Sequence, residues 1–148
     1  MFAFDFRGHG DHFCENETDM SQETLIRDTL EVIAYLSENH PGDSIVLVGH
    51  SMGGSIACKT VERVKDNEGD YAFANQIQGL FVIDVVEGTA MDALPFMEQI
   101  VTSRPPAFKS LQGVVQYALK TGTVRNLESA RVSQPHQVVE KTNDKGEK

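Results

Sequence analysis

The 148-residue sequence contains no tryptophan, only two cysteines and far fewer basic than acidic residues. Its 13 Lys and Arg residues stand against 22 Asp and Glu residues, which gives a net charge of -9. This charge argues against nucleic-acid binding through phosphate contacts, and no cluster of Lys or Arg offsets it. No apolar run approaches the ~20 residues that a membrane-spanning helix needs. We therefore expect neither nucleic acid nor a membrane as a partner.

The two cysteines, Cys14 and Cys58, lack the spacing of a metal site or of a disulfide framework. A bridge between them is the alternative, but free thiols in a reducing compartment are favoured. The first residues also lack the charged and apolar regions of a signal peptide. We therefore expect a soluble protein of the cytoplasm, with the nucleus as a second candidate location. No cluster of side chains suggests a metal or another cofactor.

The most informative stretch is IVLVGHSMGGSIA, residues 45–57. Its four leading apolar residues predict a strand buried on both faces, as in a parallel sheet covered by helices. Helical spacing of apolar residues follows Ser51, so Ser51 lies at a sharp turn between strand and helix. Gly49 and Gly53, two positions before and after it, and the adjacent Gly54 avoid the side chains that such a turn does not admit.

This pattern is typical of a nucleophile elbow, which exposes a serine hydroxyl at the end of a strand. Ser51 is therefore the candidate catalytic nucleophile. The backbone N–H of Met52 is the candidate donor of an oxyanion hole. In the alternative interpretation, Ser51 only caps the helix that follows the turn. The short motif has many chance matches, but the strand and helix around it favour the nucleophile.

Strand and helix patterns alternate along the chain and predict an α/β fold, a mostly parallel sheet with flanking helices. Further strands are expected at residues 2–6 and 80–86. Helices are expected at residues 25–36, 91–101 and 110–120, and Asp19 or Ser21 is placed to cap the first of them. The turn Asn39-His40-Pro41-Gly42 is expected to end that helix.

The length and a hydrophobic content of 40% suit one globular domain. We expect this domain to cover residues 1–133. The remaining residues, 134–148, are polar and rich in charge, and we expect them to form a disordered tail.

Asp84 interrupts the apolar run of the last predicted strand, in the order Val82-Ile83-Asp84-Val85-Val86. A carboxylate near the end of a buried strand is costly unless a partner satisfies it. One strand after a nucleophile, such an acid can hold the catalytic histidine of a hydrolase. Alternatively, it accepts hydrogen bonds from backbone N–H groups of the next loop. The residues alone leave both roles open.

Five segments, in collinear order over residues 1–133, make a more specific pattern: VGHSMGG at 48–54, FVIDVVEGTAMDAL at 81–94, RP at 104–105, FKSL at 108–111 and RNLESARVS at 125–133. Together they resemble the protein phosphatase methylesterase family of α/β-hydrolases. The segment at 81–94 is the most distinctive, because many hydrolases share the elbow.

The resemblance implies a partial α/β-hydrolase core whose first and last strands are absent. The family hydrolyses the methyl ester on the C-terminal leucine of the protein phosphatase 2A catalytic subunit, which would be the partner. A serine attacks the ester, methanol leaves and water hydrolyses the acyl-enzyme, with a histidine as base and then acid. By resemblance, Ser51 is the nucleophile and Asp84 the triad acid.

The sequence departs from the family in its histidines. The base should follow Asp84, and only His136 does, in a polar segment where we expect a tail residue rather than a base. His50 cannot reach round the elbow to the Ser51 proton, and His9 and His12 are expected in a loop.

A family strand between those expected at 2–6 and 45–48 is also absent, together with the loop that gives the second oxyanion donor. We therefore expect this chain by itself to be inactive. The alternative function is a fragment that binds the phosphatase without catalysis.

Overall fold

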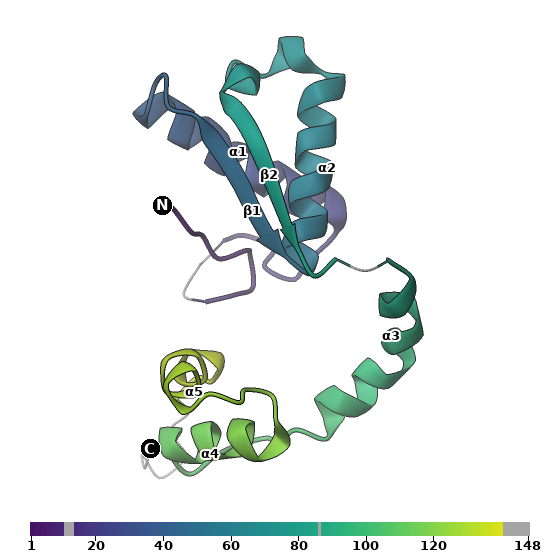
Figure 1. Cartoon of the computed structure of the whole chain (residues 1–148), viewed down its shortest axis with the longest axis vertical. Helices are drawn as coiled ribbons and strands as arrows, with labels where there is room; N and C mark the ends of the chain where they lie inside the picture. Colours follow the sequence, from purple (N-terminus) through teal and green to yellow (C-terminus); the bar gives the residue numbers. More distant parts are fainter. Residues whose placement is uncertain (11–13, 86, 141–148) are drawn as a thin grey trace. The chain divides into compact units, whose positions relative to one another are not determined.

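The computed structural model describes residues 1–10, 14–85 and 87–140. It consists of two compact units, Met1–Ala93 and Leu94–Lys148, and helix α3 (Glu87–Thr102) contains the boundary between them (Figure 1). Among the described residues, no helix combines the length and the apolar character needed to cross a membrane.

The first unit is built on a parallel pair of strands, β1 (Ile45–His50) and β2 (Ile77–Ile83). Helix α1 (Gln22–Asn39) precedes β1, and helix α2 (Met52–Asp66) connects β1 to β2 through 3-10 turns at Glu68–Asp70 and Ala74–Gln76. The register places His50 opposite Ile83, so both strands end at the same edge. This βαβ arrangement confirms the predicted α/β class.

The core of the first unit lies between the sheet and the two helices (Figure 1). Ile33 of α1 and Val64 of α2 are 2% and 3% exposed, and Ile45 and Leu47 of β1 pack against them. A second cluster joins Leu25 and Ile26 of α1 to Ile56 of α2, and Phe6 packs against it. One face of β1 therefore holds both helices in place.

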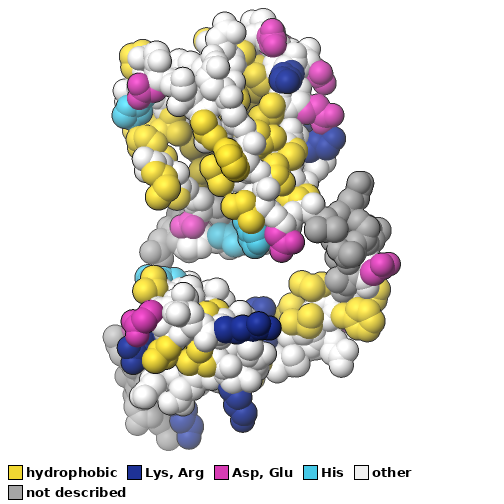
Figure 2. All heavy atoms as spheres, in the orientation of Figure 1, with side chains coloured by type: hydrophobic (Ala, Val, Ile, Leu, Met, Phe, Trp, Pro, Cys, Tyr) yellow, Lys and Arg dark blue, Asp and Glu magenta, His cyan; other side chains and the backbone are white. Residues whose placement is uncertain are grey.

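The other face of the sheet is exposed. Its apolar side chains, which Figure 2 shows on the surface, are Val46, Val48, Phe81 and Ile83, with exposed fractions between 51% and 67%. The sequence predicted burial on both faces, and within the first unit this is wrong, because none of that unit's described elements covers the second face. The continuous apolar run shows that both faces of the strand are suited to burial. Whether a face is buried depends on another element, distant in sequence, that packs on it.

Residues 2–6 do not form the predicted strand. A strand needs a neighbour for its backbone N–H and C=O groups, and among the described residues β1 pairs only with β2. The segment still runs beside β1. The ring of Phe2 lies 5.2 Å from that of His40, before β1 begins, and Phe6 packs against Ile56 of α2, after β1 ends.

An ion pair anchors the loop after this segment. Arg7 donates two hydrogen bonds of 2.6 Å to the carboxylate of Asp28 on α1, and its side chain is only 10% exposed. The hydrogen bonds to Asp28 raise the pKa of the Arg7 guanidinium. The loop is therefore fixed to α1 by a bidentate, partly buried pair.

Both predicted capping residues act at the start of α1. Ser21 is the N-cap, and its hydroxyl accepts a hydrogen bond from the N–H of Thr24. Asp19 accepts one from the Thr24 hydroxyl at 2.7 Å, which, with a second bond from Ser21, lowers the pKa of Asp19 to about 2. Asp19 therefore stabilises this end above its ordinary pKa of 3.8, and the contribution is lost as the pH falls through about 2. The helix ends at Asn39, as its turn predicted.

Most predicted elements occur with shifted ends. β2 begins three residues before the predicted strand and ends at Ile83, because Asp84 takes a φ of +52°; residue 86, the predicted end, lies outside the described residues. α3 begins before the predicted residue 91 and continues through Pro95. Cys14 and Cys58 are free thiols, as expected.

The second unit contains α4 (Leu111–Thr121), α5 (Leu127–Ser133) and a 3-10 helix at Pro135–Gln137. α4 confirms the predicted helix at 110–120, with Ser110 as its N-cap and Gly122 as its left-handed C-cap. The small core consists of Val114, Ala118, Ala130 and Gln134. The 3-10 helix lies within the segment predicted as a tail, residues 134–148, of which 141–148 lie outside the described residues. That this segment is disordered stays a prediction.

The exposed sheet face predicts that the purified chain associates with itself. Replacing Val48 and Phe81 together by lysine is expected to raise the monomeric fraction, because the double variant breaks an apolar patch beside an open strand edge. Light scattering after size-exclusion chromatography measures this fraction. Tyr35→Lys, at a residue of α1 that is 64% exposed, is the control and should leave it unchanged. An equal effect of both changes would contradict the assignment to the sheet face.

Candidate active site

Ser51 lies between the end of β1 and the start of α2, with an exposed side chain. Its backbone has φ +52° and ψ −118°, a combination that non-glycine residues rarely adopt. Its N–H donates a 2.9 Å hydrogen bond to the carbonyl oxygen of Ile83 at the end of β2. This is the strained strand-to-helix turn that the sequence predicted.

The hydroxyl of Ser51 makes no capping hydrogen bond to α2. The alternative interpretation, in which the Ser51 side chain caps α2, is therefore wrong. With the positive φ, the serine keeps its hydroxyl available at the edge where both strands end.

Two of the three glycines that the sequence predicted for this turn allow it to pack this tightly. A Cβ atom at Gly49 would meet the backbone of the first turn of α2, with the nitrogen of Gly54 2.6 Å away. A Cβ atom at Gly54 would lie 2.6 Å from a methyl group of Val85 and 3.0 Å from the Gly49 oxygen. At Gly53 the nearest atom, on Phe6, is 3.9 Å away. The steric demand therefore falls on Gly49 and Gly54, whereas Gly53 has room.

Met52 is the first residue of α2. The N–H groups of a first helical turn have no acceptor within their own helix, and the N-terminus of a helix favours negative charge. No acidic residue lies in the first turn of α2 to offset this field. The predicted oxyanion donor is thus an amide at the positive end of a helix, directly after the serine.

Asp84 directly follows β2, and the register places it beside the elbow. Its φ is also +52°, and its carboxylate lies 3.8 Å from Nε2 of His50. Both side chains are exposed, by 74% and 66%. The structure thus brings Ser51 and Asp84 to one edge. The structure also places His50 beside Asp84, which was not predicted from the sequence. The parallel register of the two strands could have indicated this pair.

The other histidines are placed as follows. His9 lies in a loop, and its Nδ1 is 3.1 Å from the Arg7 carbonyl oxygen. His136 is an exposed residue of the 3-10 helix in the second unit, and His12 lies outside the described residues. The roles predicted for Ser51, Met52 and Asp84, and the absence of a role for His136, remain predictions.

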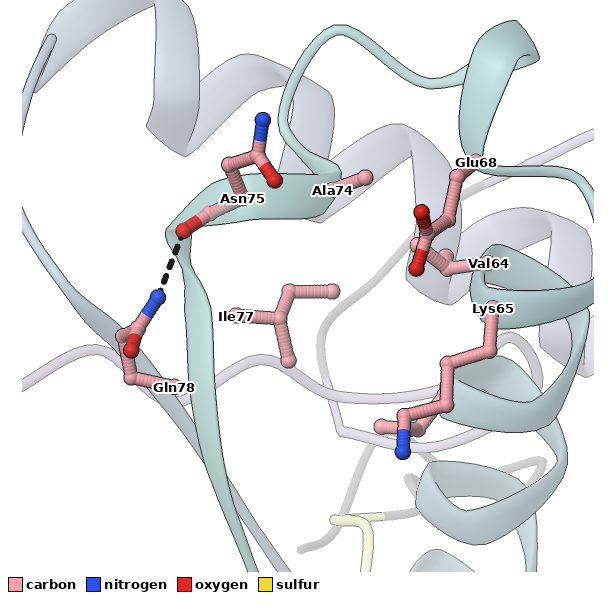
Figure 3. Close-up of a pocket in the computed structure, with 8 residues that line it drawn as sticks. Val64, Lys65, Glu68, Ala74, Asn75, Ile77 and Gln78 are labelled. Atoms are coloured by element: carbon pink, nitrogen blue, oxygen red, sulfur yellow. Dashed lines mark hydrogen bonds between the residues drawn. The ribbon is translucent and has the colours of Figure 1, made fainter.

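One cavity lies at the opposite end of the sheet (Figure 3). It has a volume of about 210 Å³, and its walls include Val64, Lys65 and Ile77. Gln78 donates a 2.6 Å hydrogen bond to the Asn75 carbonyl beside it. Since Ile77 begins β2 and Asp84 follows its end, about 20 Å of strand separates this cavity from the elbow. It is therefore not the site at which Ser51 would meet a substrate.

Comparison with known families agrees with the geometry of the elbow. The family model described as serine aminopeptidase, S33, matches residues 1–145. The chain belongs to this α/β-hydrolase family. Its partial core, with a parallel sheet and helices, is the fold that the sequence predicted.

Curated relatives match the family that the sequence resembles. Protein phosphatase methylesterase 1 of Mus musculus is 44% identical over 141 residues, which cover 93% of this chain and 33% of the relative. The Homo sapiens protein of the same name is 43% identical, with the same coverage, and that of Schizosaccharomyces pombe is 39% identical over 95% of this chain and 39% of the relative. The chain therefore spans between about a third and two fifths of these relatives.

The crowding at the elbow gives a test of its geometry. Gly49→Ala is expected to displace the turn, because the new methyl group would overlap the start of α2 and cost about 1–3 kcal/mol. Gly53→Ala is the matched control and should be tolerated. The backbone amide chemical shifts of Ser51 and Met52, measured by NMR, report the displacement. Equal shifts for both variants would contradict the packing described for this turn.

Proposed function

We propose that this chain is the nucleophile-bearing part of a serine carboxylesterase that removes a protein methyl ester. The substrate is the methylated C-terminal leucine of the protein phosphatase 2A catalytic subunit, and the working compartment is the cytoplasm, with the nucleus as second candidate. The observation that carries the proposal is the geometry of Ser51, which lies on a positive-φ turn ahead of α2 and whose hydroxyl makes no capping hydrogen bond to that helix. Similarity to relatives named protein phosphatase methylesterase 1 supports the choice of ester over peptide.

The proposed reaction is acyl transfer. Oγ of Ser51 attacks the ester carbonyl while a base takes its proton, and the negative charge develops on the former carbonyl oxygen. The N–H of Met52, at the N-terminus of α2, stabilises that charge. The base returns the proton to the departing methoxide, so methanol leaves. Water then attacks the acyl-enzyme by the same route and releases the carboxylate and Ser51.

In this mechanism Asp84 holds the catalytic histidine in the tautomer that accepts the serine proton. Its position supports the role, because the carboxylate is exposed at the edge that carries Ser51 and has an imidazole 3.8 Å away. That imidazole belongs to His50, which precedes the nucleophile within the elbow. We propose that the base is another histidine and that the chain alone, without it, is inactive.

The second candidate function is binding of the phosphatase without catalysis. It follows from the same similarity, because the matched region extends through the second unit, which carries no candidate nucleophile. Ester hydrolysis by a full-length protein that carries this sequence separates the two functions, because only the first function requires it.

Ser51→Ala in a full-length protein that carries this sequence is expected to abolish ester hydrolysis and labelling by a fluorophosphonate probe, because no other group forms the acyl-enzyme. Ser55→Ala, one turn into α2, is the matched control and should keep both. Probe labelling that survives Ser51→Ala would remove Ser51 from the mechanism. The 148-residue chain should show no p-nitrophenyl ester hydrolysis above its own Ser51→Ala variant, and Ser51-dependent turnover there would assign the base to the chain itself.

Asp84→Asn in the same full-length protein is expected to lower turnover by about 10⁴ at neutral pH, through the wrong histidine tautomer. Asp92, an exposed residue of α3, is the competing carboxylate. Asp92→Asn should leave turnover near that of the wild type. Loss of turnover in the Asp92 variant alone would show that Asp84 is the wrong carboxylate.

A further inference from the structure

A groove lies between the second half of α1 and the segment that leads into β2. Its volume is about 480 Å³, within the range typical of ligand clefts, ~300–1,000 Å³. Its floor is apolar and consists of Leu30, Ala34, Tyr71 and Phe73. Phe73 is a buried member of the cluster around Ile33, and Leu30, Ala34 and Tyr71 are partly buried side chains packed against that cluster. Packing in the core therefore fixes the floor. We name this surface the α1 groove.

The rim of the α1 groove is acidic. Glu31 and Glu38 lie seven residues apart on α1 and so share one side of the helix, and Asp70 lies on the facing segment. All three are exposed, and none forms an ion pair with another described residue. Of the described residues that line the groove, only Arg27 is basic. The negative end of α1 adds to this potential near Glu38, since its last turn has no basic residue.

The charge of the whole unit has the same sign. Residues 1–93 contain 5 Lys and Arg against 17 Asp and Glu, a formal charge of -12, and residues 94–148 contain 8 against 5, a charge of +3; the two make up the -9 of the chain. A cleft of one sign on a body of that sign attracts ligands of the opposite sign and speeds their association.

We propose that the α1 groove binds a segment of another protein that carries a lysine or arginine next to an apolar side chain. The aliphatic stem of the basic side chain and its apolar neighbour cover the partly buried Leu30, Ala34 and Tyr71, and the charged head reaches the rim. Each acidic side chain at the rim is free to accept it. This docking goes beyond ester chemistry, because the groove adjoins the start of β2 and Ser51 lies past the end of β1.

The test uses a fluorescein-labelled peptide of lysine, leucine and serine, titrated by fluorescence anisotropy with the 148-residue chain in which Val48 and Phe81 are both replaced by lysine to keep it monomeric. Glu31→Gln with Asp70→Asn is expected to lower the affinity by about fivefold or more, as loss of two exposed charge pairs predicts. Glu15→Gln with Asp66→Asn removes the same charge elsewhere on the unit, from exposed residues, and should change the affinity by less than about twofold. Raised ionic strength should weaken binding.

Two altered peptides test the two parts of the recognition. Replacing leucine by serine should weaken binding because it removes the contact with the floor, and replacing lysine by glutamate should abolish it. Equal losses in the groove and control variants, or undiminished binding of either altered peptide, would overturn the proposal. Glu38→Gln is a second groove variant for use if circular dichroism shows that the double variant loses helix. Self-association that requires Glu31 and Asp70 would assign the groove to a second copy and overturn it too.

Discussion

The hydrogen bond from the Ser51 N–H to the Ile83 carbonyl oxygen, 2.9 Å long, is the interaction on which the candidate site depends. It extends the ladder between β1 and β2 by one residue, to the point where both chains turn away. Ser51 and Asp84 then both adopt a φ of +52°, and such conformations cost about 1–3 kcal/mol each. The parallel ladder and the packing of α2 offset this cost. Because both turns start from one ladder, a shift in the register of β1 against β2 would move the proposed nucleophile, Ser51, away from its proposed acid, Asp84.

The position of α2 follows from the same constraint. Gly49 and Gly54 bring the first turn of the helix against the end of β1, at a distance that no side chain would permit. Further along the helix, Val64 packs with Ile33 of α1 and fixes its other end. The helix therefore has one available direction, and its N-terminal amides lie at the serine. The strained turn and the core both depend on how α2 packs, so packing in the core also fixes the position of the site.

Local sequence patterns predicted those features of the structure that local interactions determine. The elbow and the Ser21 cap of α1 each depend on a few neighbouring residues. Residues 2–6 failed as a strand because strand formation depends on a neighbour, which propensity does not supply. The Arg7–Asp28 pair, 21 residues apart, left no local signal. Nor did the His50–Asp84 approach, which only the register creates.

Electrostatics at Ser51 differ in sign from those of the unit around it. The first unit carries a formal charge of -12, which opposes the negative charge that an ester hydrolase must stabilise. The first turn of α2 contains no acid, so no carboxylate of the helix itself offsets the field that its N-terminus exerts on the oxyanion. Distant acids are screened over about 8–10 Å at physiological salt, whereas the Met52 amide directly follows the serine. For the proposed ester, the same background favours release, because hydrolysis turns a neutral substrate into a carboxylate that the acidic unit repels.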